Sequence, residues 1–201
     1  GSSEVDYTVN SATGLPFLTG LADDDRPTNH VLPAWDLITG QSAVNGLLAA
    51  ERHRSRSGEG QYLSVALSDI AFWTMGTLGL IAEKEIGGVD REATGNDLFG
   101  AFGRDFETAD GRRAMIVAIT RRQWWALVEA TGLADAVAAI ETRTGLDLDL
   151  EGDRYRATGE LVAALEPWCR ARSLAEIAAA FEGTGVCWGP YRSIAQMLAE
   201  D

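Results

Sequence analysis

The sequence contains few of the residues that build metal sites and disulfide frameworks. Its 201 residues include two cysteines and two histidines. Cys169 and Cys187 show no Cys-x-x-Cys or mixed cysteine–histidine spacing. His30 and His53, a loop and a surface residue by their context, leave little material for a zinc site or a Ser-His-Asp triad. We therefore expect no metal site, and we expect both thiols to be reduced.

Long apolar runs and positive charge are scarce as well. No run approaches the ~18 consecutive apolar residues of a membrane span. Residues 1–6 lack the basic start and the apolar core of a signal peptide. Acidic residues outnumber basic residues by 30 to 17, which gives a net charge of −13 and repels a phosphate backbone. We expect a cytoplasmic protein with no membrane and no nucleic acid among its partners.

The hydrophobic content of the chain, 46%, is that of an ordinary globular protein. Turn residues dominate residues 1–32, which predicts an extended segment and loop. After them, the apolar spacing predicts a helix over 33–54, a short strand over 61–67 and a helix over 69–85. Polar, unpatterned residues then predict a linker.

The second half of the chain has a different pattern. A turn sequence, Ala109-Asp110-Gly111, lies between two segments that predict a β-hairpin over 98–106 and 113–119. The other expected elements are helices over 122–131, 133–144 and 154–171, the last interrupted by Pro167, a capped helix from Ser173 to about Glu182, a strand over 186–188 and a helix from Ser193. We expect the core of this half to contain Trp124, Trp125, Trp168 and Trp188.

Asp36 is the first candidate for a catalytic residue. It lies in the first turn of the expected helix over 33–54, where the positive end of the helix dipole favours an ionised carboxylate. Small residues follow at helical spacing, so that a backbone or a ligand can approach closely: Gly40, Ala43 and Ala50, with Leu47 between them. An alternative is that Asp36 only complements the dipole and that the small residues only pack.

Two further segments are weaker candidates. The basic stretch from Arg52 to Gly60 has the charge to bind a phosphate, or it serves the carbonyl groups at a helix end. Gly100 and Gly103, followed by Arg104, resemble a flexible substrate loop. They lack the strand-to-helix context of a dinucleotide fingerprint.

The block from Asp36 to Gln61 closely resembles the class III CoA transferases. It has an aspartate, a glycine four residues later, Gly-Leu-Leu-Ala-Ala, and then Arg-x-Gly-x-Gly-Gln. The segment 99–111 is similar to the family's hairpin, and the resemblance covers nearly the whole chain. It implies an α/β fold: residues 1–86 as part of a Rossmann-like large domain, 87–97 as linker, 98–190 as a small α+β domain and 191–201 as the start of a return segment.

The resemblance also implies an activity. Acyl-CoA and carboxylate substrates would exchange CoA through an aspartyl anhydride and an aspartyl-CoA thioester on Asp36, with no permanently bound cofactor. The full-length protein would be an interlocked homodimer. The implied contacts are, for CoA, Glu4, Val5, Asp6 and Tyr7, and, for the substrate loop, Gly100, Gly103 and Arg104.

Within the family, the first 36 residues are most similar to members that move CoA between two carboxyl groups of one molecule. Transfer to a second carboxylate is an alternative, and a non-catalytic scaffold whose Asp36 only caps its helix is another. The family's racemases have a histidine in the segment matching residues 1–14 and an acid in the segment matching 117–123. This sequence has neither, so racemase activity is disfavoured.

Overall fold

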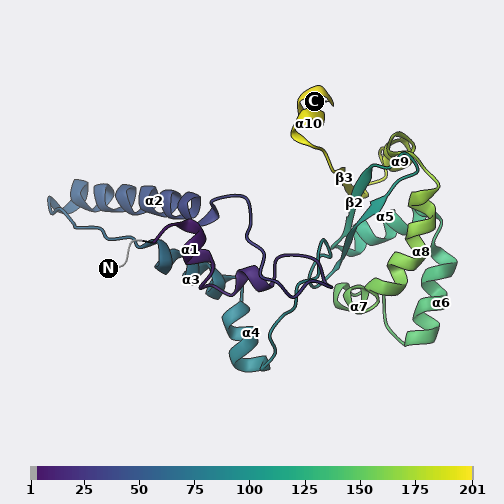
Figure 1. Ribbon diagram of the computed structural model, residues 1–201, viewed down its shortest axis with the longest axis horizontal. Coiled ribbons are helices and arrows are strands. Elements are labelled where there is room, and N and C mark those ends of the chain that lie inside the picture. The colour runs from purple at the N-terminus through teal and green to yellow at the C-terminus, as the bar shows by residue number, and fades with distance from the viewer. Residues whose placement is uncertain (1–3, 201) are drawn as a thin grey trace. The chain divides into compact units, whose positions relative to one another are not determined.

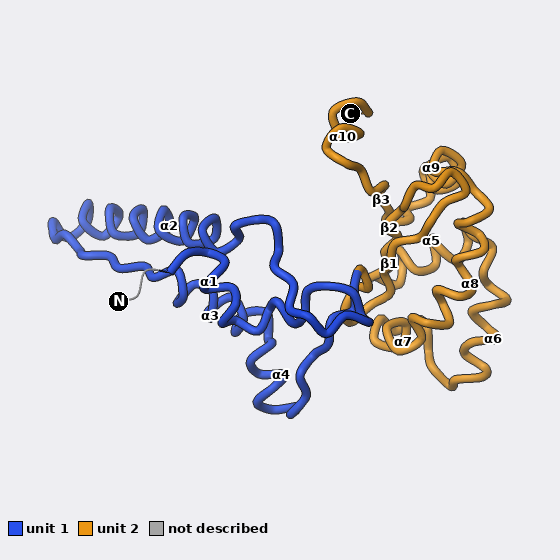
Figure 2. The backbone as a smooth tube through the Cα atoms, viewed as in Figure 1, with its two compact units in different colours: residues 1–95 blue, residues 96–201 orange. Residues whose placement is uncertain are grey.

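The computed structural model describes residues 4–200 and divides the chain into two compact units, Gly1–Gly95 and Asn96–Asp201 (Figure 2). The division falls within the segment that the sequence marks as a linker. Unit 1 contains the helices shown in Figure 1: α1 (Asp6–Asn10), a short 3-10 helix (Leu15–Phe17), α2 (Ala34–Ser57), α3 (Leu67–Thr77) and α4 (Leu80–Gly87).

The core of unit 1 is small and lies at the start of α2. Helices α1, α2 and α3 meet there around the indole of Trp35, which is 2% exposed. The other buried apolar members are Val9, Ala71 and Met75. Of α2, this core contains Trp35, with Ile38 packed against it. The helix otherwise exposes apolar side chains, among them Leu37, Val44, Leu47 and Leu48.

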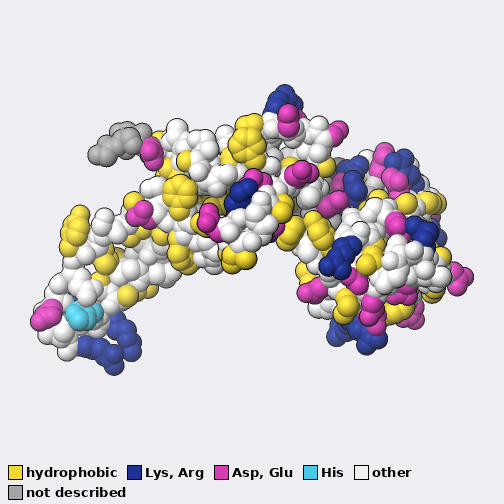
Figure 3. All heavy atoms as spheres, turned by 90° about the horizontal axis from the view of Figure 1, so that it is seen from below, with side chains coloured by type: hydrophobic (Ala, Val, Ile, Leu, Met, Phe, Trp, Pro, Cys, Tyr) yellow, Lys and Arg dark blue, Asp and Glu magenta, His cyan; other side chains and the backbone are white. Residues whose placement is uncertain are grey.

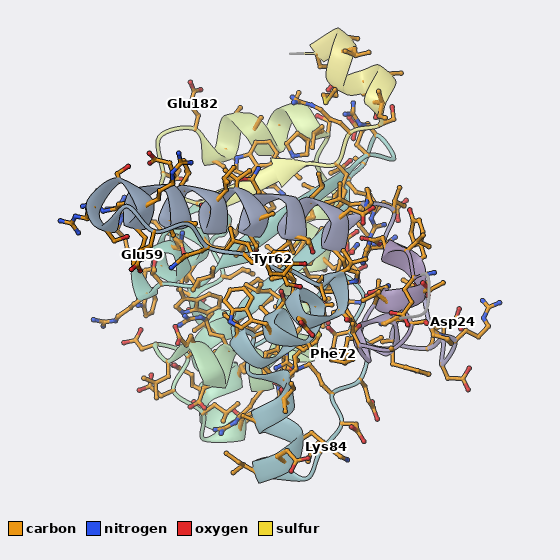
Figure 4. All side chains as sticks on the ribbon, turned by 90° about the vertical axis from the view of Figure 1, so that its left-hand side faces the viewer. Asp24, Glu59, Tyr62, Phe72, Lys84 and Glu182 are labelled. Carbon is orange, nitrogen blue, oxygen red and sulfur yellow. The ribbon has the colours of Figure 1, made fainter. Side chains whose placement is uncertain are left out.

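The strand predicted over residues 61–67 is wrong. Residues 59–66 are extended and run back beside α2 (Figure 1), where Leu63 lies against Gly46. A strand needs a hydrogen-bonded neighbour, and the described part of unit 1 contains no strand for this segment to pair with. Tyr62, labelled in Figure 4, is accordingly 93% exposed.

Two other expectations for unit 1 need correction. The single helix expected over 69–85 is two helices, because Gly79 adopts φ +79°, a left-handed conformation that ends one helix and starts the next. The segment expected to be loop contains α1. Its start is fixed locally, since the backbone N–H of Val5 donates to Oγ1 of Thr8 at 2.9 Å.

Unit 2 is a three-stranded antiparallel sheet packed with helices. The strands are β1 (Phe102–Glu107), β2 (Arg113–Ala118) and β3 (Cys187–Pro190), in the order β1-β2-β3. The predicted hairpin is therefore confirmed. The helices are α5 (Arg121–Thr131), α6 (Ala134–Thr144), α7 (Glu151–Arg156), α8 (Thr158–Arg170), α9 (Leu174–Phe181) and α10 (Ile194–Glu200).

Aromatic rings fill much of the core of unit 2. Trp168 stacks on Phe181 with ring centroids 5.3 Å apart, and Trp188 meets Phe181 edge-on at 5.9 Å. Trp124 is buried in the same cluster. Trp125 differs, because it is 43% exposed and donates its indole N–H to Asp149. The prediction of a tryptophan core is right for three of the four residues.

The helical region around Pro167 is interrupted, but not at the proline. Pro167 lies inside α8, and the break comes earlier, at Ala157 between α7 and α8. The capping box of α9 is confirmed: Ser173 donates its backbone N–H to Glu176, and Oγ of Ser173 accepts the backbone N–H of Glu176. Both cysteines are free, and burial raises the pKa of the Cys169 thiol to about 12.

Candidate active site at the start of helix α2

Asp36 is the third residue of α2, and its side chain is exposed, so the expected position in the first helical turn is confirmed. The residue before the helix is Pro33, whose ring offers no oxygen to the free N–H groups of the first turn. Those N–H groups therefore need an acceptor from elsewhere in the chain.

Asp6 supplies that acceptor from α1. Its Oδ2 accepts the backbone N–H of Trp35 at 2.7 Å and that of Asp36 at 3.1 Å. The Asp6 side chain is 2% exposed. The positive end of the α2 dipole and two N–H donors compensate for burying this carboxylate. A residue 30 positions away in sequence therefore fixes the backbone of the candidate nucleophile.

A second polar residue of α1 holds the neighbouring indole. Trp35 donates its ring N–H to Oδ1 of Asn10 at 3.0 Å, and Asn10 donates to Oδ1 of Asn29 at 2.9 Å. Asn10 is 1% exposed. Because Asp6 and Asn10 are four residues apart on a helix, both project toward the start of α2.

His30 lies beside the same helix end. Its ring is 6.4 Å from that of Tyr7 and 6.0 Å from that of Trp35, between centroids. Within residues 4–200, both ring nitrogens of His30 and Oδ1 of Asp6 are buried without a hydrogen-bond partner. The start of α2 therefore has unused hydrogen-bonding capacity near the exposed carboxylate of Asp36.

The structure thus brings the candidate nucleophile Asp36 together with part of the expected CoA contacts. Of the residues expected to contact CoA, Asp6 and Tyr7 lie at the start of α2, and Glu4, Val5 and Tyr7 are exposed. Their contact with CoA stays a prediction. The sequence analysis missed the capping role of Asp6 and the place of Asn10. Their spacing of four residues would have placed both on one face had α1 been recognised as a helix.

The expected substrate loop lies in unit 2 and is largely not a loop. Gly103 and Arg104 belong to β1, and Gly100 occupies the turn before it with φ +81°. A Cβ on Gly103 would lie 2.9 Å from Cβ of Leu98, so close packing requires glycine there. Substrate contact at these residues stays a prediction.

Arg104 also has an electrostatic partner. It pairs with Asp97 at 3.3 Å. Burial raises the pKa of the Asp97 carboxyl, and the positive charge of Arg104 opposes that shift.

Other features of the chain lie away from the start of α2. Figure 3 shows basic side chains gathered at the far end of unit 1, where Arg52, Arg54 and Arg56 of α2 are exposed. A pocket of about 910 Å³ is lined by residues from 13–25 and 75–93, not by Asp6 or Asp36. Among residues 4–200 there is no cluster of three or more potential metal ligands and no helix long and apolar enough to cross a membrane.

A family model described as CoA-transferase family III matches residues 2–201. The chain belongs to CoA-transferase family III. It is 55% identical over all 201 residues to "2-methylfumaryl-CoA isomerase" of Chloroflexus aurantiacus and covers 49% of that protein. Over 142 residues it is 33% identical to "Succinyl-CoA:mesaconate CoA-transferase" of Haloarcula marismortui, covering 69% of this chain and 34% of that one. The chain therefore spans about half the length, or less, of these relatives.

Solved structures of the same fold include a CAIB/BAIF family protein from Brucella suis, with TM-score 0.72 and 21% identity. Another is Rv3272 from Mycobacterium tuberculosis, with TM-score 0.75 and 19% identity. Each match covers 98% of this chain, and 50% and 49% of the respective neighbour. At these identities the likeness supports the family III fold rather than a particular substrate.

Proposed function

We propose that this chain carries the catalytic aspartate of an acyl-CoA:carboxylate CoA transferase, and that Asp36 is the nucleophile. One observation carries the proposal: Asp36 exposes its carboxylate in the first turn of a 24-residue helix, and the backbone at that residue is fixed by a buried carboxylate. A nucleophile must be both accessible and held in place, and this arrangement gives Asp36 both properties.

The proposed reaction proceeds by acyl transfer to Asp36 and back. The carboxylate attacks the thioester carbonyl, and the C–S bond breaks. The CoA thiolate departs, and a mixed anhydride remains on Asp36. The thiolate then attacks the aspartyl carbonyl, releases the acyl group as a free carboxylate and leaves an aspartyl-CoA thioester. The acceptor carboxylate repeats these steps in reverse, so Asp36 is regenerated and CoA ends on the acceptor.

The proposed substrate is 2-methylfumaryl-CoA, with donor and acceptor as the two carboxyl groups of one molecule. The support is 55% identity over the whole chain to a relative whose name states an isomerisation of 2-methylfumaryl-CoA. Intermolecular transfer is the alternative, because the name of the Haloarcula relative describes succinyl-CoA as donor and mesaconate as acceptor.

An isotope experiment distinguishes these two reactions. We expect the complete protein to isomerise 2-methylfumaryl-CoA with no added acid, because the released acid stays in the site until CoA returns to its other carboxyl group. Added ¹³C-labelled mesaconate should stay out of the thioester pool, measured by mass spectrometry. Entry of the label would favour the intermolecular reaction, and no transfer to either acceptor would contradict the proposed activity.

We also propose that the complete protein is a homodimer. The support is the set of apolar side chains that α2 exposes, including Leu47 at 63% and Leu48 at 61%, because large apolar patches on soluble proteins usually mark interfaces. Sedimentation analysis should give the mass of two chains over the accessible concentration range. A single-chain mass at high concentration would count against this assembly.

A further inference from the structure

We propose that Asp6 is a positioning residue for Asp36: its buried carboxylate holds the backbone of α2 so that the Asp36 side chain points at the thioester. This inference rests on the proposed function, because it assigns Asp6 a task only if Asp36 is the nucleophile. It differs from the CoA contact that the sequence predicts for Asp6, since a side chain that is 2% exposed is directed into the protein.

The backbone of the first turn of α2 sets the direction of the Asp36 side chain. In the part of the chain that the structure describes, the carboxylate of Asp36 is exposed and forms no hydrogen bond or ion pair. The Asp36 backbone N–H, by contrast, donates to Oδ2 of Asp6. The orientation of the carboxylate therefore depends on where this N–H and the rest of the first turn are held.

Asp6 is well suited to hold that turn. One oxygen accepts two consecutive N–H groups, from Trp35 and Asp36, which fixes both the position and the rotation of the helix start. Hydrogen bonds to a charged acceptor are shorter and stronger than those to a neutral one. Pro33, at the capping position of α2, has no side-chain oxygen to replace Asp6.

Asn10 sharpens the assignment because it serves the same helix end differently. It accepts from the indole N–H of Trp35, a side-chain group, whereas the backbone N–H of Asp36 donates to Asp6. The two buried polar residues of α1 thus have different roles. Asn10 orients a core ring, and Asp6 orients the backbone that carries the nucleophile.

The test compares variants of the complete protein by kcat, KM and melting temperature. Asp6→Ala should lower kcat by ~10–100-fold, because a displacement of about 1 Å at the reacting group can cost that much, while KM for the thioester stays unchanged. Asp6→Asn keeps an oxygen acceptor, and asparagine caps helices as well as aspartate does. It should therefore recover most of the lost kcat.

Ser173→Ala is the matched control. It removes the cap of another helix, α9 in unit 2, and should lower the melting temperature with kcat unchanged. A second readout follows the chemistry itself: trapping the acylated Asp36 with hydroxylamine should be slower in Asp6→Ala by the same factor as kcat. A purely structural role would reduce the amount of folded protein without changing this rate per folded molecule.

The outcomes separate this inference from the proposed function. If Asp6→Ala loses stability but folded protein keeps wild-type kcat, Asp6 is only a structural cap and the inference is wrong. If Asp36→Ala is active, the proposed function itself fails. If Asp6→Ala does not fold, Asp6→Ser decides, because its shorter side chain keeps a cap oxygen without reaching both N–H groups. Wild-type kcat in folded Asp6→Ser would overturn the inference.

Discussion

Asp36→Ala should reduce CoA transfer by the complete protein more than ~10³-fold, the scale seen when an enzyme loses its nucleophile. The fold should survive, because the Asp36 side chain is exposed and loss of an acid in a first helical turn costs only ~0.3–1 kcal/mol. Asp36→Asn should be almost as inactive, because the amide keeps the shape of the side chain but does not form an anhydride. Steady-state transfer rates and melting curves measure the two effects separately.

Chemical trapping supplies the direct readout for the same residue. Hydroxylamine added to protein incubated with acyl-CoA should convert activated Asp36 to a hydroxamate, in a peptide between Val31 and Arg52. That stretch contains one other carboxylate, Glu51, so fragmentation of the peptide assigns the modified residue. Asp36→Asn serves as the control and should give no hydroxamate.

The possible failures of this experiment are informative. A hydroxamate on Glu51 or outside the peptide, or an active Asp36→Ala, would contradict the mechanism and return Asp36 to its role as a helix-start acid. With a saturated acyl-CoA, exchange of the α-proton without labelling of Asp36 would favour a racemase reaction, which needs no acyl-enzyme. Absence of both reactions in folded complete protein would favour the non-catalytic scaffold.

The features that the sequence predicted correctly are those determined by nearby residues. The hairpin β1–β2 follows from a turn between two alternating segments, and the start of α9 follows from the pair Ser173 and Glu176. The place of Asp36 in the first turn of α2 likewise follows from local apolar spacing. Each of these depends on residues a few positions apart.

The features that were missed depend on partners far apart in sequence. Alternation over 61–67 is compatible with a strand, but a strand also needs a paired neighbour, and the described part of unit 1 has none to offer. The hydrogen bond from Asp36 to Asp6 spans 30 positions. Even with a family resemblance that named both residues, nothing in their spacing showed that one holds the backbone of the other.

Arg154 illustrates the same limit in unit 2, because arginine is usually found at the surface and this one is 1% exposed. Its guanidinium donates to the backbone carbonyls of Leu148 at 2.8 Å, Asp149 at 3.0 Å and Ile119 at 2.6 Å. It also lies 5.6 Å from the ring centroid of Trp124. Burial lowers the pKa of Arg154, and the charges of Glu151 and Asp149 oppose that shift.

These contacts predict the largest stability effect in the chain. Arg154→Met should lower the free energy of unfolding of unit 2 by about 3–5 kcal/mol. Three carbonyl groups lose a charged donor, and the buried carbonyl of Leu148 is left without a hydrogen bond. Arg154→Lys keeps the charge but not the planar fork of donors, so its loss should be intermediate. Urea unfolding followed by tryptophan fluorescence measures both losses, since Trp124 packs beside the guanidinium.

Arg156→Ala is the matched control for this prediction. It lies two residues away on the same helix, is 71% exposed and pairs with Asp153 at 2.8 Å. Exposed ion pairs contribute about 0–1 kcal/mol, so its loss should be small. If Arg154→Met is no less stable than Arg156→Ala, then the three carbonyl groups find other donors or water. In that case the hydrogen bond from Arg154 in α7 to the carbonyl of Ile119, after β2, does not stabilise unit 2.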